Sequence, residues 1–567
     1  MNQDVGHATL SAYFKSIRNL LIPLTLFTIS FIIIPLRQFR GLDLIPGDLG
    51  DARFNNYVLE TIYLRLTGKV DSFWNMEMFF PYPLVGGFSD NHIGSALFYV
   101  VPRLFLSQPD TAFQLWFLIG YFLNFVSAYI AFRKLGMSTF GASVGSGIFA
   151  FAFPTSVHAI HAQLHHRWAL PMAILAISKF LKGHGPRWLG IAALWAVLQF
   201  YIGFYTGFFT SLFIVAMIFA HVIIQILKRF FSRKSQGNEK KLFDRLDRKT
   251  ITSLISMMFI SIGSLTVLFY PYYQVSKYYV GFRSWEEISS MLPRPQSYFL
   301  IDSSFLWQNM AQSIEGIPQR WEHQMFVGAV PLALFIFGAI AVLLTRNRTG
   351  LEIYAAAALI IIVTLFVNGT SLWFYLHNAP LFSAIRAVSR VDQTLLFAVG
   401  YGAALFISWV GSKQFKKFFF ITPLLLVLTL LALAEASTGT ISTSEKTVWR
   451  DRISNLEKQV PQNLPDDSVL FFAQTDPSDL WFAHELDSMW VALKYGKPTI
   501  NGYSGQAPPN WLFTYGTDCQ VISNFNSFYQ RWMSSNTYPS EKYLALKNKI
   551  VPIGFTNCDN ASELIHP

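Results

Sequence analysis

The sequence predicts a polytopic α-helical membrane protein with about eleven transmembrane helices and a C-terminal extracytoplasmic α/β domain. Of its 567 residues, 52% are hydrophobic and only 14% are charged, whereas about a quarter of the residues in a soluble protein are charged. Several apolar runs approach the roughly 20 residues that a helix needs to cross a bilayer. Lys and Arg gather between these runs, as the positive-inside rule requires, so the net charge of +11 needs no nucleic-acid partner.

The first apolar run, Leu20 to Leu36, lacks a small-residue cleavage site and is followed by further runs. We therefore interpret it as a retained helix rather than as a cleaved signal peptide. The other predicted spans are at about 111–132, 140–157, 167–182, 188–206, 207–227, 250–270, 324–345, 351–368, 393–411 and 418–436.

Basic residues set the predicted orientation. Lys15 and Arg18 place the N-terminus in the cytoplasm, and the basic loop 228–249 is also cytoplasmic. The transmembrane module is then 1–436, and the tail 437–567 lies outside. The predicted external loops are a first loop 37–110, a second 158–167 and a long loop 271–323.

Two short segments of the first external loop are helix candidates that do not span. Gly94 to Leu106 is apolar but short and contains Pro102 and Arg103, so we expect an interfacial or re-entrant helix. In Ala52 to Leu66, apolar residues recur every four positions between polar ones, which predicts an amphipathic helix at the membrane surface.

In the tail, Ser468 to Ala473 is a strand candidate and Leu480 to Leu493 is a helix candidate. Cys519 and Cys558 are the chain's two cysteines. In an oxidising compartment they are a candidate disulfide pair.

Acidic side chains follow the first span. Asp48 and Asp51 lie in a glycine-punctuated turn just before Arg53, which suits a general base or a cation site. The alternative is that Asp51 only caps the following helix. Farther on, Asp90 and His92 could share a metal or orient a substrate hydroxyl, and capping is again the alternative.

Histidines mark the second external loop. The spacing of His158, His161 and His165 would place three imidazoles on one helix face, where they could bind zinc. The alternative is that they are ordinary satisfied polar residues at an interface.

Two further polar pairs precede later spans. Glu322 and His323 return the long loop to the mouth of the bundle. Arg386 and Arg390, four residues apart, are predicted to share one helix face and suit a phosphate. A salt bridge to Asp392 or Glu322 is the alternative. The sequence has no Gly-rich nucleotide loop and no serine nucleophile elbow, and so no sign of ATP or NAD use.

The loop arrangement, with an acidic residue soon after the first span, resembles that of the GT-C glycosyltransferases. This superfamily includes protein O-mannosyltransferases, the oligosaccharyltransferase catalytic subunit and lipid A aminoarabinose transferases. The strings at 47–55, 79–81, 89–92 and 501–505 also resemble those of a bacterial group of this type, which implies a bacterial inner membrane.

The resemblance implies an inverting transferase that moves a sugar from a polyprenyl-phosphate donor in one in-line displacement. Asp51, with a raised pKa, would be the general base, and Asp48 the alternate. Arg386 and Arg390 would bind the lipid phosphate.

Candidate residues for holding donor or acceptor are Arg53, Asp90, His92, Glu322 and His323. The second loop carries histidines where relatives carry acidic residues, so a divalent metal stays an open question. The acceptor is equally open between lipid, glycan and protein.

Two other classes of protein compete with the transferase. A lipid-linked saccharide flippase would need polar groups near the middle of its spans, where this chain has few charges. A non-catalytic scaffold with a glycan- or partner-binding tail would tolerate Asp51→Asn.

Overall fold

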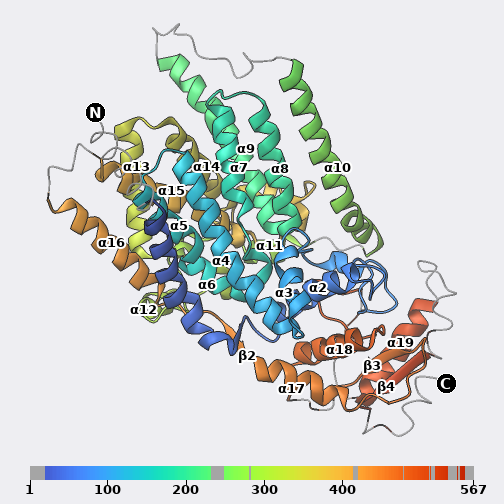
Figure 1. Ribbon diagram of the computed structural model, residues 1–567. Coiled ribbons are helices and arrows are strands. Elements are labelled where there is room, and N and C mark those ends of the chain that lie inside the picture. The colour runs from blue at the N-terminus through green and yellow to red at the C-terminus, as the bar shows by residue number, and fades with distance from the viewer. Residues whose placement is uncertain are drawn as a thin grey trace, which may run out of the picture.

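The computed structural model describes residues 19–231, 248–279, 283–412, 419–474, 476, 478–509, 511, 518–533, 546, 549–555 and 558. Most of the predicted basic loop 228–249 lies outside these residues, as do Lys15 and Arg18. A helical bundle occupies one part of the molecule, and the C-terminal elements lie against one end of it (Figure 1).

Every predicted span coincides with one helix or with two consecutive helices. They are Asn19–Leu36, α4 (Pro109–Lys134), α5 (Thr139–Phe151) with α6 (Phe153–Val157), α7 (Ala169–Leu181), α8 (Arg187–Ile202), α9 (Phe204–Phe231), α10 (Arg248–Tyr278), α13 (Ala329–Thr345), α14 (Arg348–Thr364), α15 (Asp392–Val410) and α16 (Ile421–Ala436). Within the described residues, 6 helices are long and apolar enough to cross a membrane by length and composition.

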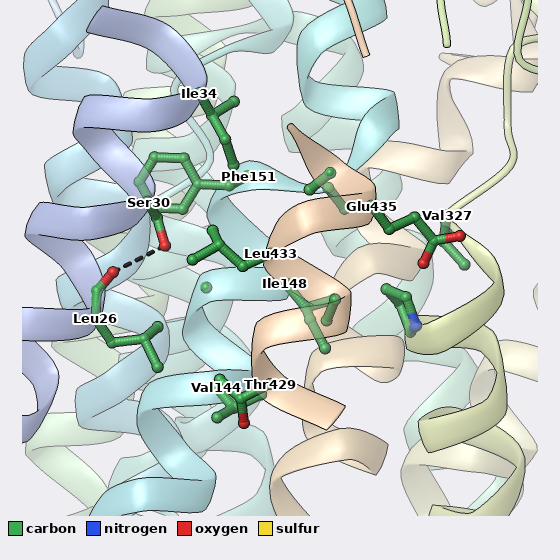
Figure 2. A pocket seen from close by; sticks show the side chains of 15 residues that line it. Leu26, Ser30, Ile34, Val144, Ile148, Phe151, Val327, Thr429, Leu433 and Glu435 are labelled. Carbon is green, nitrogen blue, oxygen red and sulfur yellow. Dashed lines mark hydrogen bonds between the residues drawn. The ribbon is translucent and has the colours of Figure 1, made fainter. Parts of the chain in front are cut away.

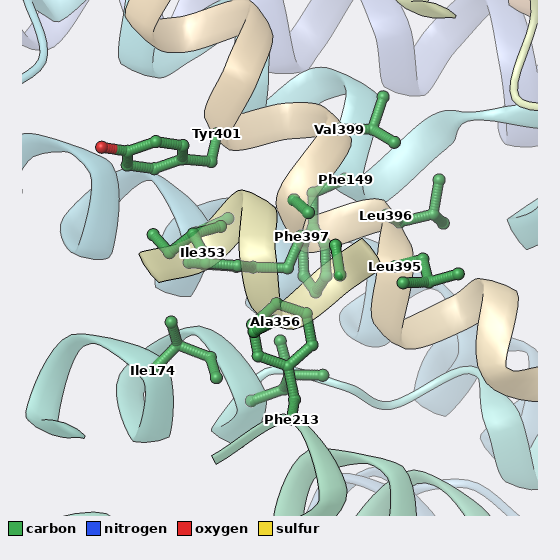
Figure 3. Packing of buried hydrophobic residues seen from close by; sticks show 14 of the residues in the cluster. Phe149, Ile174, Phe213, Ile353, Ala356, Leu395, Leu396, Phe397, Val399 and Tyr401 are labelled. Carbon is green, nitrogen blue, oxygen red and sulfur yellow. The ribbon is translucent and has the colours of Figure 1, made fainter. Parts of the chain in front are cut away.

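Helix α15 is buried along most of its length and packs against α5 and α13. A Cβ on Gly145 of α5 would lie 2.3 Å from the Gly400 carbonyl oxygen of α15, so only glycine permits this approach of the two helices. Around it, Phe149, Phe213 and Phe397 fill the interior (Figure 3).

Helix α2 (Asp51–Leu66) forms where the amphipathic helix was predicted, but the exposed face expected of an amphipathic helix is covered by other parts of the protein. Residues Ala52–Ile62 are all buried, including Arg53 and Glu60, because the C-terminal elements and the loops cover every face. Helix α3 (Leu97–Phe105) matches the second candidate. Its 9 residues rise only about 14 Å, too little to span a bilayer.

The remaining elements are short; η1 is the π-helical end of the first span, and the others lie between the longer helices. They are η1 (Ile32–Leu36), η2 (Arg40–Leu42), η3 (Val85–Phe88), η4 (His158–Ile160), η5 (Ala162–Leu164), α11 (Trp285–Ser290), η6 (Pro295–Phe299), α12 (Gln308–Gln312), η7 (Arg320–His323), η8 (Leu372–Tyr375), η9 (Phe382–Ala384) and η10 (Val388–Val391).

After the last helix of the bundle, β2 (Thr443–Glu445) pairs antiparallel with β1 (Leu44–Pro46), Ile45 lying opposite Ser444. The chain continues through α17 (Lys446–Glu457), β3 (Val469–Phe472), α18 (Trp481–Tyr495), α19 (Asp518–Met533) and β4 (Ile550–Ile553). Strands β3 and β4 are parallel. β3 and α18 occupy the predicted strand and helix.

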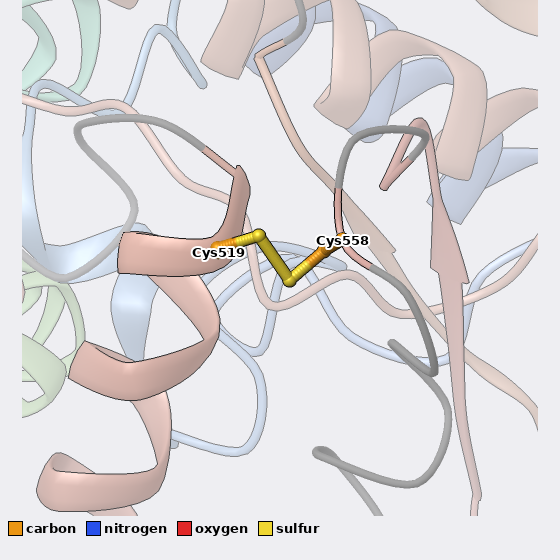
Figure 4. Close-up of a disulfide and its surroundings, with 2 residues drawn as sticks. All are labelled: Cys519 and Cys558. Atoms are coloured by element: carbon orange, nitrogen blue, oxygen red, sulfur yellow. A yellow bond between two sulfur atoms is a disulfide. The ribbon is translucent and has the colours of Figure 1, made fainter.

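Cys519, in α19, and Cys558, just after β4, are joined by a disulfide with a Cα–Cα distance of 5.4 Å (Figure 4). The bond ties the end of the described chain back to the last helix across a sequence separation of 39 residues.

An apolar crevice lies between the first span, α5 and α16 (Figure 2). Glu435 of α16 stands at its edge and accepts hydrogen bonds from the backbone N–H groups of Ala329 and Val330 at 2.6 and 2.9 Å. This carboxylate therefore satisfies the first turn of α13.

Candidate active site

Four segments that are far apart in the sequence meet at the His161 imidazole. Asp51, the first residue of α2, lies with its Oδ2 3.0 Å from His161 Nδ1. On the other side of the ring, His161 Nε2 lies 3.3 Å from Glu322 Oε1 and 3.2 Å from Arg390 Nη2. The first loop, the second loop, the long loop and the segment before α15 each supply one of these side chains.

Glu322 and Arg390 form a two-point ion pair. Arg390 donates through Nε to Oε2 at 2.9 Å and through Nη2 to Oε1 at 2.7 Å. The guanidinium also lies 5.0 Å from the centre of the Tyr205 ring, which contributes a cation–π contact. Both charged side chains are almost fully buried, so the pair fixes the geometry of the cluster.

The charges at the centre set the protonation of the cluster. Burial would raise the pKa of Asp51, but the His161 imidazole, the Tyr503 hydroxyl and the Arg390 charge outweigh it and lower that pKa to about 2. The predicted raised pKa of Asp51 is therefore wrong. Burial also opposes ionisation of Glu322, yet Arg390 and His161 hold its pKa well below the usual range.

Asp48 differs from Asp51 in the direction of its pKa shift and in its hydrogen-bond partner. Burial raises the pKa of Asp48, and the neighbouring Asp51 charge adds to this effect. Its Oδ1 accepts a hydrogen bond from the Ala52 N–H at 3.1 Å. The capping role that was the alternative for Asp51 is thus carried by Asp48, and Asp51 faces the cluster.

A divalent metal would find ligands here. Ligand atoms of His158, His161 and Glu322 all lie within 4.8 Å of one another, and two imidazoles with a carboxylate are a donor set that zinc accepts. His158 Nε2 also lies 3.1 Å from Asp392 Oδ2, a carboxylate that would orient the ligand.

The predicted face of three histidines is wrong. His158–Ile160 is a 3₁₀ turn, and the chain bends at His161 before a second one, so no continuous helix carries all three rings. His165 instead hydrogen-bonds the Phe117 carbonyl at 2.7 Å and stacks on the Phe117 ring.

Asp90 and His92 have separate partners. The Asp90 carboxylate accepts a hydrogen bond from the Phe204 N–H and so caps the distant helix α9 rather than α3, which follows it in the sequence; burial raises its pKa to about 6. His92 Nε2 lies 2.6 Å from Asn55 Oδ1, and burial lowers its pKa to about 3. Through Asn55 and Gln163, His92 connects to the second loop.

Three other candidates lie outside the cluster. Arg53 is fully buried and pairs with Asp487 of α18, so it fastens α2 to the C-terminal elements. His323 Nδ1 lies 2.8 Å from the Ser297 hydroxyl and Nε2 lies 2.9 Å from the Ser290 carbonyl oxygen, which holds the long loop together.

Arg386 is the third candidate residue that lies outside the cluster. It precedes η10 rather than sharing a helix face with Arg390, so the predicted common face is wrong. It pairs with Glu287 at 3.3 Å and is 33% exposed, which leaves the guanidinium open to solvent.

Sequence reasoning missed Tyr503. Its hydroxyl donates to Asp51 Oδ1 at 2.6 Å from a sequence distance of 452 residues. The string 501–505 was noted only as part of a resemblance, and no local pattern marks this tyrosine as a partner of Asp51.

The fold is that of the GT-C membrane glycosyltransferases, and the chain is an integral membrane protein. It is similar to the archaeal oligosaccharyltransferase AglB from Archaeoglobus fulgidus in complex with an inhibitory peptide and a dolichol-phosphate. That comparison has a TM-score of 0.50 and 12% identity over 94% of this chain and 72% of the other. The Archaeoglobus fulgidus oligosaccharyltransferase tethered to an acceptor peptide with the NVT sequon matches at a TM-score of 0.51 and 12% identity, over 91% and 68% of the two chains.

ArnT from Cupriavidus metallidurans, bound to undecaprenyl phosphate, aligns at a TM-score of 0.42 and 11% identity over 95% of this chain and 96% of the other. No protein-family profile and no curated protein sequence matches the chain.

Proposed function

We propose that the protein is an inverting glycosyltransferase that moves a sugar from a polyprenyl-phosphate donor to an extracytoplasmic acceptor. The observation that carries this proposal is the convergence of Asp51, His161, Glu322 and Arg390 from four separate segments. Such a convergence at the mouth of a GT-C bundle is what a shared substrate site requires. Scaffolding alone gives no reason to gather four ionisable groups, three of them buried, at one place.

In the reaction, the acceptor oxygen attacks the anomeric carbon of the sugar while the bond from that carbon to the phosphate oxygen breaks. The acceptor's proton passes to a carboxylate. Asp51, with its low pKa, is a weak base that orients the acceptor, whereas the raised pKa of Asp48 makes it the stronger base of the two.

The departing lipid phosphate needs positive charge. Arg390 is already compensated by Glu322, but Arg386 is partly exposed beside Glu287. Arg386 is therefore the better phosphate ligand, and Arg390 holds the shape of the site. A divalent metal, held by His158, His161 and Glu322, would supply a Lewis acid for the same negative charge.

We place the protein in a bacterial inner membrane with about eleven spans, a cytoplasmic N-terminus and an extracytoplasmic C-terminal part, because this orientation follows the positive-inside rule. The carboxylate cluster and the C-terminal elements then share the outer side, where the acceptor is met.

The test is transfer of labelled sugar from a polyprenyl-phosphate donor by the purified full-length protein, with membrane extract supplying acceptors. Asp51→Asn should lower turnover by a factor of at least about 100. Asp71→Asn, an exposed acid-to-amide change in the same loop, is the matched control and should keep turnover. Equal turnover in both variants would refute the assignment of Asp51.

A further inference from the structure

Three aromatic side chains of the C-terminal part cluster at the turn that carries the two carboxylates. The rings of Trp481, Phe482 and Tyr503 have centroids within 6.2 Å of one another. A Cβ on Gly50 would lie 3.3 Å from the Phe482 ring and 3.2 Å from Asp48 Oδ2, so ring and carboxylate border the same turn. The Asp51 side chain is 36% exposed, and Trp481 is 42% exposed.

The backbone just before Tyr503 is fixed in place, so the tyrosine can give way to a ligand only by turning its side chain. The Asn501 side chain bonds the backbone of Phe472 in β3 at both of its ends, 2.8 and 2.9 Å, and the Gly502 N–H donates to Glu485 of α18 at 2.8 Å. A Cβ at Gly502 would lie 2.2 Å from the Phe79 ring, so only glycine fits between the two parts of the molecule.

The Tyr503 hydroxyl makes a contact of the kind an acceptor would make. It donates to Asp51 Oδ1 at 2.6 Å, while the other carboxylate oxygen faces His161. In the proposed transfer, Asp51 orients the attacking hydroxyl by accepting a hydrogen bond from it, which is the bond that the Tyr503 hydroxyl makes here. The tyrosine thus marks where that hydroxyl sits and must yield to it.

We infer that the acceptor is a saccharide, which Trp481 and Phe482 bind through the apolar faces of their rings while Asp48 and Asp51 accept hydrogen bonds from its hydroxyls. A sugar ring presents both features: C–H groups on its faces and hydroxyls around its edge. The exposed ring of Trp481, the half-buried ring of Phe482 and the paired carboxylates match these features, whereas the carboxylates would repel a phosphorylated acceptor. The inference rests on the proposed function.

Saccharide binding is tested without the donor, so that it can fail separately from transfer. The full-length protein in detergent would be titrated with the methyl glycosides of glucose, galactose, mannose and N-acetylglucosamine and with an Asn-Val-Thr hexapeptide. Tryptophan fluorescence and calorimetry would report the binding. At least one glycoside should bind, and Trp481→Ala should weaken that binding by at least about fivefold.

Matched variants separate ring contact from misfolding. Trp481→Phe keeps an aromatic face and should retain most of the affinity. Tyr495→Ala removes a similarly exposed ring, 39%, from the other end of α18, about 21 Å away along the helix, and should leave affinity unchanged. Tyr503→Phe removes only the competing hydroxyl and should bind the glycoside at least as tightly as the wild type.

No glycoside binding, equal binding by the wild type and Trp481→Ala, or selective binding of the peptide would overturn the saccharide assignment. If sugar transfer still depended on Asp51 in those cases, the glycosyltransferase proposal would stand and only the saccharide assignment would fall. If glycoside binding depended on Trp481 but no transfer occurred, the saccharide site would remain and the transferase proposal would fall.

Discussion

The Arg390 guanidinium donates one hydrogen bond to each oxygen of the Glu322 carboxylate, at 2.7 and 2.9 Å. Each of the two side chains is at most 5% exposed. The two residues come from the long loop and from the segment before α15. Their pairing therefore fastens the long loop to the segment that leads into α15.

Removing only Arg390 should destabilise the folded protein more than replacing both Arg390 and Glu322. Arg390→Met leaves Glu322 buried and uncompensated, with an expected loss of about 3–5 kcal/mol. The double variant Glu322→Gln/Arg390→Met should recover part of that loss. Thermal unfolding in detergent measures both, and a double variant no more stable than Arg390→Met would contradict a coupled pair.

The buried pair of Arg53 and Asp487 should hold the C-terminal part on α2. Arg53→Met is expected to destabilise the protein by about 3–5 kcal/mol and to expose the residues after 437 to limited proteolysis. Arg65→Met, an exposed change on the same helix, is the control. Equal protease resistance of the two variants would show that the pair does not fasten this part.

Asp90 should make stability depend on pH below neutrality. Because burial raises its pKa to about 6, the folded state holds this proton more tightly than the unfolded chain, so stability falls as pH rises from about 4 to 6 and then levels off. Nearby Arg390 stays charged throughout. Asp90→Asn keeps the capping oxygen but cannot ionise.

The melting temperature of Asp90→Asn minus that of the wild type should therefore grow between about pH 4 and 7. A constant difference over this range would mean that Asp90 does not titrate there.

Chelator-treated protein should bind Zn²⁺ or Mn²⁺ through the cluster. His161→Ala should abolish the calorimetric signal because it removes a central ligand. His165→Gln should not, since that ring bonds Phe117 instead. Loss of binding in both variants, or in neither, would rule out this ligand set.

The disulfide should stabilise the end of the C-terminal part. Replacing both Cys519 and Cys558 by serine should cost about 2–4 kcal/mol locally. Hydrogen exchange of α19 and β4 should rise, while exchange in α15 stays unchanged. Unaltered exchange in α19 would indicate that the bond contributes no stability.

The helices could be predicted because a helix that crosses the hydrocarbon of a bilayer needs a long apolar run, and such runs can be recognised in the sequence. The site could be predicted only in part. Asp51, His161, Glu322 and Arg390 were singled out one at a time by residue type. Their meeting depends on how loops fold back over the bundle, which no local spacing encodes.

The failures have specific physical causes. His158 and His161 share a face because a 3₁₀ turn eclipses positions three apart, and His165 leaves it because the chain bends between them. Helix α2 lacks the exposed face expected of an amphipathic helix because the C-terminal part covers it, through Arg53 and Asp487 among others. Contacts over more than 400 residues leave no periodic trace in a sequence.

The short ladder between β1 and β2 has a topological consequence. Exposed strand edges cannot sit in hydrocarbon, so residues 44–46 and 443–445 emerge at one and the same water boundary. The chain must then traverse the bilayer an even number of times between them. If α3 were one more crossing, the number of crossings between β1 and β2 would be odd. The two strands would then lie on opposite sides of the membrane and could not pair.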